Sequence, residues 1–181
     1  MNDKFQYRLS KKQKAEIAQN LIDILQKDSE ITEQTITFIG NWILTGSEEK
    51  GKAFFDVWDI VLKNYLPTTR PVLFRACERL GKDGKIVSFT GRLDSARRFS
   101  KGRGFLIACD TKDTLLFDEL KSQPGQYEYT FYPLVSVLEK AEASGGGGFS
   151  ENILNYIGED EYIMKLDLGS IYSFMWMKNN L

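Results

Sequence analysis

Histidine is absent from this chain of 181 residues. Its absence excludes catalysis by a Ser-His or Cys-His pair, zinc sites with imidazole ligands and any imidazole general base. Any chemistry must therefore use carboxylates, arginine or lysine, hydroxyl groups or a bound cofactor.

Cysteine and long apolar runs are also scarce. The two cysteines, Cys77 and Cys109, lie in apolar segments and are too few for a tetrahedral thiolate site or a disulfide framework. We expect buried free thiols, which suit a reducing compartment. No segment approaches the roughly 20 apolar residues of a membrane span, and residues 1–21 lack the apolar core of a signal peptide. The expectation is a cytoplasmic protein without membrane contact.

An excess of charge of either sign is missing as well. The chain has 24 basic and 25 acidic residues, so its net charge predicts no general attraction to nucleic acid. Its hydrophobic fraction of 42% suits a packed core. We expect a single domain over 1–181.

Hydrophobic spacing divides this domain into two parts, a helical part over 1–68 and a β-rich part over 69–181. The first part predicts one helix capped by Ser10, a second over 32–44, and a third that is capped by Ser47 and ends before Pro67. In the second part the sequence predicts one or two helical turns over 94–99 and six short strands, and it leaves 115–120 and 134–138 ambiguous. The strand candidates are 72–76, 86–90, 105–109, 127–132, 162–166 and 171–176. The fold class is therefore α+β.

Arg75 interrupts the apolar strand 72–76. A guanidinium in such a place needs a partner, because an unpaired buried charge is costly. Either a neighbouring glutamate pairs with it at the strand edge, or its fixed donors bind a phosphate or carboxylate.

Ser88 and Thr90 lie on one face of the strand 86–90, and Phe89 points to the other face. These hydroxyls either decorate an exposed strand or serve a site. Near the C-terminus, Glu159 and Glu161 share a face if a strand begins there, with carboxylates roughly 5–7 Å apart. Such a pair is either a solvated acidic turn or a site where one carboxylate stabilises a developing cation while the other aligns a nucleophile.

The order of these three motifs resembles the mono-ADP-ribosyltransferases of the Arg/Ser-Thr-Ser/Glu-X-Glu class. The similar segments are VLFRAC, IVSFTGRLDSARRFS and GEDEYIMKLDLGSIYSF. The helices ending in NYLPTTRPVLFR are similar in layout to small bacteriophage enzymes that modify host proteins. The resemblance implies N-terminal helices packed on a two-sheet, mostly antiparallel β core. The class also needs no histidine, unlike the His-Tyr-Glu branch of the superfamily.

The resemblance implies that NAD is the substrate, that no metal is needed, and that nicotinamide leaves as ADP-ribose is transferred. Glu161 would stabilise the oxocarbenium-like transition state, Glu159 would orient or deprotonate an arginine acceptor, and Ser88 would support Glu161. Arg75 would hold NAD phosphate or ribose, and Thr90 would support the same site. The acceptor would be a host macromolecule, preferably a protein, and nucleic acid is not indicated by charge.

Three further features would complete such a site. Arg103, in the loop 101–104, would contact the pyrophosphate; alternatively, this loop is a basic surface turn. Phe99 would pack near the nicotinamide or in the helix core. The segment 145–158, which begins with four glycines and includes Phe149, would select the acceptor.

The chain departs from the family pattern in two places, with Phe89 in the middle motif and Ala76 after the arginine. Phe89 points away from the site, so we expect it to be tolerated, whereas Ala76 can alter the clearance of the pocket. Two other functions remain open: an NAD glycohydrolase, and a non-catalytic module that binds a host protein.

Overall fold

The computed structural model describes residues 7–47, 49–79, 84–100, 104–112, 130–145, 156–166 and 172–175. Its helices are α1 (Lys11–Lys27), α2 (Glu33–Leu44), α3 (Lys52–Asn64), α4 (Leu93–Ser100) and α7 (Val135–Ala143). Its strands are β1 (Val72–Cys77), β2 (Ile86–Thr90), β3 (Phe105–Asp110), β4 (Phe131–Pro133), β5 (Glu161–Lys165) and β6 (Tyr172–Met175). Within these residues the protein is α+β, as predicted.

The first two helices begin where their capping residues predict. Ser10 forms a capping box with Gln13, and the Thr32 side chain accepts a hydrogen bond from the Thr35 backbone N–H. The predicted start of the third helix at Ser47 is wrong, because α3 begins after Gly51, which makes no side-chain cap. The aromatic stripe of α3 is buried against α1 and α2 from Phe54 onward, so packing fixes this helix more than capping does.

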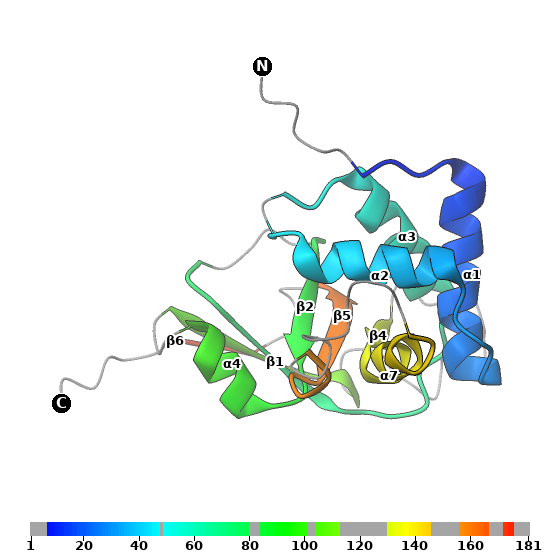
Figure 1. The fold of residues 1–181 in the computed structure, drawn as a ribbon. Coiled ribbons are helices and arrows are strands. Elements are labelled where there is room, and N and C mark those ends of the chain that lie inside the picture. Colours follow the sequence, from blue (N-terminus) through cyan, green and yellow to red (C-terminus); the bar gives the residue numbers. More distant parts are fainter. Residues whose placement is uncertain are drawn as a thin grey trace, which may run out of the picture.

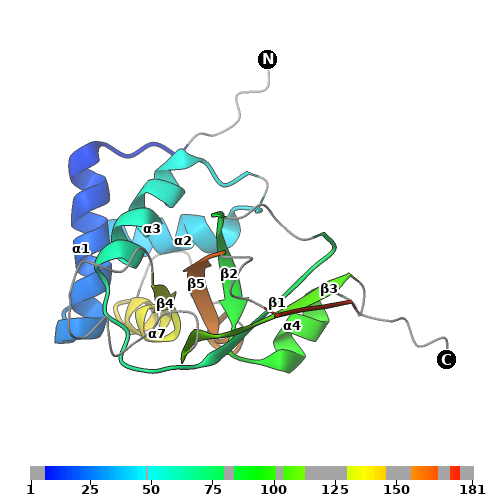
Figure 2. The ribbon, with the colours of Figure 1, turned by 180° about the vertical axis from the view of Figure 1, so that it is seen from behind.

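All six described strands form one sheet, in the order β4-β5-β2-β1-β3-β6, with every neighbouring pair antiparallel. The β1–β2 junction is narrow, because one pair of residues, Phe74 and Thr90, joins the two strands. Three strands lie on each side of this junction, which we call the seam. Figures 1 and 2 show α1, α2, α3 and α7 gathered beside β4, β5 and β2, whereas α4 lies next to β1.

Alternating side chains divide the central strands between two apolar clusters. Ile86 and Ile163 join the cluster that the helices build, and Val87, Phe89 and Met164 belong to the second cluster. Ser88 and Thr90 are at even steps from Ile86, so they lie on the helix-facing side of β2. The predicted opposite orientation of Phe89 is therefore confirmed.

The segment after β4 is helical where the sequence left helix and strand open. Val137 and Leu138 are fully buried in α7. The strand predicted over 127–132 is described only as β4, and the segments 115–120, 127–129 and 167–170 lie outside the described residues. Neither cysteine forms a disulfide; Cys109 is buried as expected, whereas Cys77 is only partly buried. Among the described residues, no helix has the length and apolar character to cross a membrane.

Gly104 directly precedes β3 and lies close to the end of β1, the strand that carries Arg75. Its φ is +79°, and a Cβ there would lie 2.3 Å from the Cys77 carbonyl oxygen and 2.8 Å from the Glu78 Cα. We expect Gly104→Ala to lower the free energy of unfolding by at least about 2 kcal/mol, since backbone rather than a side-chain end would have to move.

Urea denaturation followed by circular dichroism measures this difference. Gly51→Ser is the matched control, because a Cβ at Gly51 would meet no described atom within 4 Å apart from its chain neighbours, and serine is a favoured N-cap. Equal stability of Gly104→Ala and the wild type would contradict the expectation.

Candidate active site

One cavity of about 310 Å³ lies where α2, the centre of the sheet, α4 and the turn before β5 meet. This volume is at the lower end of the range of ligand pockets. The cavity collects most of the predicted site residues from distant parts of the sequence. Those that line it are Arg75, Ser88, Thr90, Phe99, Glu159 and Glu161.

Glu161 is the first residue of β5, and its carboxylate is held by two donors. The Ser88 hydroxyl donates to Glu161 Oε1 at 2.5 Å, and the Trp42 indole Nε1 donates to the same oxygen at 3.4 Å. No described residue donates to Oε2. One oxygen is thus fixed by the fold while the other is available to a ligand in the cavity.

Arg75 reaches across the seam from β1. Its Nη1 donates to the Ser88 backbone carbonyl at 2.6 Å, and it forms no ion pair with a described acidic residue. The predicted strand-edge salt bridge is therefore not seen among the described residues. Burial lowers the pKa of Arg75, and the charges of Cys77 and Glu161 oppose that shift. A partly buried guanidinium with one neutral partner keeps donors available for an anion.

Glu159 reaches the cavity from a turn and not from a strand. β5 begins at Glu161, and Asp160 between the two glutamates has a φ of 50°, in the left-handed region. The strand on which the predicted spacing of the two carboxylates depended therefore does not include Glu159. Glu159 and Glu161 nevertheless line the same cavity.

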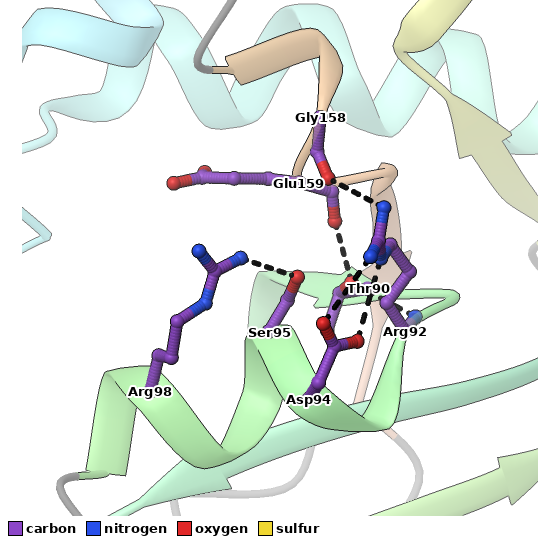
Figure 3. A network of polar contacts seen from close by, with 7 residues as sticks. All are labelled: Thr90, Arg92, Asp94, Ser95, Arg98, Gly158 and Glu159. Atoms are coloured by element: carbon purple, nitrogen blue, oxygen red, sulfur yellow. Dashed lines mark hydrogen bonds and ion pairs between the residues drawn. The ribbon is translucent and has the colours of Figure 1, made fainter.

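Residues at the end of β2 bind the backbone of the turn that carries Glu159. The Thr90 hydroxyl donates to the Glu159 carbonyl at 2.5 Å and accepts from the Arg92 N–H at 3.0 Å. Arg92 Nη1 also reaches the Gly158 carbonyl at 3.5 Å, as Figure 3 shows. Thr90 is therefore a positioning residue for Glu159.

The environment of the Glu159 carboxyl disfavours its ionised form. Burial and the charge of Glu161 raise its pKa, and Arg98 on α4 partly opposes them. In Figure 3 the Glu159 side chain extends over the same side of α4 as Arg98. A carboxylate with a raised pKa is suited to accept a proton.

Two of the predicted accessory residues lie outside the described residues, namely Arg103 and Phe149. Of the four-glycine run, only Gly145 is described. Phe99 is 61% exposed and borders the cavity. It is not part of the helix core, which removes one of its two predicted roles.

Sequence reasoning missed several residues that line the cavity, among them Trp42, Lys50 and Tyr156. Trp42 has the spacing of a core residue in α2, and it is indeed 1% exposed. Its contact with Glu161 spans 119 positions, so no local pattern could reveal it. Lys50 precedes α3 without a motif around it.

Trp42 is expected to help position the Glu161 carboxylate. Trp42→Phe removes the indole donor and keeps a ring in the aromatic cluster with Phe54 and Trp58. If Glu161 is catalytic, we expect kcat to fall about fivefold with little change in KM, since a long hydrogen bond to a charged group is lost.

Trp58→Phe provides the control for this change. Trp58 is fully buried in the same cluster, and its Nε1 has no partner among the described residues. Steady-state kinetics with both variants separates loss of the donor from loss of ring volume. Equal effects of the two substitutions would rule out the positioning role of Trp42.

Among the described residues, no group of three or more acidic, cysteine or histidine side chains could hold a metal ion. The groups that the cavity offers to a ligand are carboxylates, hydroxyls and cations. The chain matches no family model, no curated protein and no solved structure.

Proposed function

We propose that this protein is an NAD-dependent mono-ADP-ribosyltransferase that acts on a macromolecule, with an arginine side chain as the acceptor. The observation that carries the proposal is the hydrogen bond of 2.5 Å from Ser88 to Glu161 inside a cavity that Arg75 and Glu159 also line. The three motifs with which the sequence resembles this class thus supply side chains to a single site.

The reaction requires stabilisation of a forming cation. The bond between ribose C1′ and the nicotinamide nitrogen breaks, and its electron pair leaves with nicotinamide. The ribose ring becomes oxocarbenium-like, and Glu161, fixed through Oε1, stabilises it by charge and by a hydrogen bond to a ribose hydroxyl. The acceptor nitrogen then bonds to C1′, and its proton passes to the Glu159 carboxylate.

Arg75 supports binding of the dinucleotide. Among the described residues its guanidinium has one hydrogen-bond partner, the Ser88 carbonyl, and the Ser88 hydroxyl also holds Glu161. An anion bound by Arg75 would therefore lie beside the catalytic carboxylate. The described strands form one sheet and not the two that the resemblance implies, and the narrow seam, with three strands on either side, is where two such sheets would divide. The host protein as acceptor and the host cytoplasm as compartment follow from the resemblance to bacteriophage enzymes.

Incubation of the pure protein with NAD labelled in the adenylate part, with and without cell extract, tests the proposal. We expect release of nicotinamide together with label on extract proteins. Nicotinamide release without a labelled macromolecule would favour the glycohydrolase. Absence of NAD binding in calorimetry would overturn the enzymatic function and favour the binding module.

A further inference from the structure

Lys50 places a second cation in the cavity. It lies between α2 and α3, and its Nζ is 3.6 Å from the centroid of the Trp42 ring. This is the distance of a cation–π contact, which holds the ammonium in place without neutralising it. Trp42 is itself fixed by Phe54 and Trp58, so the lysine rests on a rigid surface.

The ammonium of Lys50 has no acidic hydrogen-bond partner in the described part of the chain. Burial lowers its pKa, Glu161 opposes this shift by its charge, and Arg75 adds to it. Lys50 and Arg75 thus repel each other across one cavity. Two partly desolvated cations that repel each other are unfavourable; the charge of Glu161 offsets part of this cost, and an anion bound between them would offset more of it.

We propose that Lys50 and Arg75 together form a cation pair that binds the diphosphate group of the nucleotide substrate. The inference rests on the proposed function, to which it adds a binding residue that no motif in the sequence marks. The two side chains serve different geometric needs. The guanidinium offers a planar fork to two oxygens, and the ammonium acts as a point charge.

The position of Lys50 also predicts how the substrate lies in the cavity. Trp42 contacts Lys50 through its ring and Glu161 through its Nε1. The same indole therefore lies between Lys50, where the diphosphate would bind, and the Glu161 carboxylate. A substrate held at its diphosphate by Lys50 would present the attached ribose to Glu161.

ADP is the probe, because it contains the diphosphate and lacks nicotinamide. Calorimetry on the full chain should show that Lys50→Met raises the Kd for ADP about tenfold, the effect of losing one charge-assisted contact. Lys50→Arg, which keeps the charge and can stack on Trp42, should stay within about threefold of wild type. Adenosine, without phosphate, should bind both variants and the wild type equally.

Lys52→Met is the matched control, since this exposed lysine pairs with Asp56 and does not line the cavity. It should bind ADP as wild type does. Unchanged or tighter ADP binding by Lys50→Met, or an equal loss of adenosine binding, overturns the inference. If the wild type binds ADP in this Lys50-dependent way but does not cleave NAD, the proposed reaction fails and the cation pair stands.

Discussion

Glu161→Gln is expected to lower the rate of nicotinamide release from NAD by about a hundred- to a thousandfold. The glutamine keeps the size of the side chain and an oxygen that can accept from Ser88 and Trp42. It lacks the negative charge that stabilises the oxocarbenium-like ribose in the proposed reaction, and loss of one fixed electrostatic group lowers rates by this order. Because the charge acts in the transition state, the loss should appear in kcat, with KM nearly unchanged.

Single-turnover measurement of nicotinamide release by chromatography checks this expectation. Glu139→Gln on α7 is the control, because Glu139 is exposed and does not line the cavity. Its rate should equal that of the wild type. Release by Glu161→Gln at more than a tenth of the wild-type rate would contradict the catalytic role of this residue.

Glu159→Gln should separate the two halves of the reaction. We expect transfer to an arginine acceptor to fall about a hundredfold, which is typical for loss of a general base, while NAD is still hydrolysed. The reason is that in the proposed reaction Glu159 meets the acceptor, whereas the Ser88–Glu161 pair, which would act at the ribose, is left intact. Parallel assays of nicotinamide release and of labelled arginine product measure the two halves.

Asp160→Asn is the matched control for Glu159. Asp160 is the neighbouring carboxylate and has a positive φ that asparagine tolerates. Transfer should survive this change. If Glu159→Gln abolishes nicotinamide release as well as transfer, its assignment to the acceptor half fails.

The pH dependence of Glu159 provides a second test of the same residue. Its pKa is raised in the folded protein by burial and by Glu161, so transfer should increase as the pH rises through a value above the ordinary glutamate pKa of 4.5. The folded state also holds this proton more tightly than the unfolded state does. Glu159→Gln should therefore stabilise the protein above the raised pKa, and this advantage should vanish below pH 4.5.

Local patterns predicted much of the fold because local interactions determine much of it. Ser10 and Thr32 cap the helices that their side chains indicate, and alternation along β2 puts Ser88 and Phe89 on opposite faces. The predicted start of α3 is wrong, because burial of its aromatic stripe outweighs the capping preference of Ser47.

The candidate site could be predicted in its residues but not in its geometry. Arg75, Ser88 and Glu161 line one cavity, yet the left-handed Asp160 rather than strand spacing brings Glu159 to it. A lone acidic residue with positive φ has no clear sequence signature. Trp42 and Lys50 belong to the site only through tertiary contacts, which a single sequence does not encode in any local pattern.

The seam between β1 and β2 gives the site a mechanical role. One residue pair, Phe74 with Thr90, and the Arg75–Ser88 hydrogen bond join two groups of three strands. A ligand held by Arg75 on one side and by Glu161 on the other acts as an additional crosslink between these groups. Part of its binding free energy therefore becomes resistance of the sheet to splaying, which amide hydrogen exchange along β1 and β2 would register as added protection.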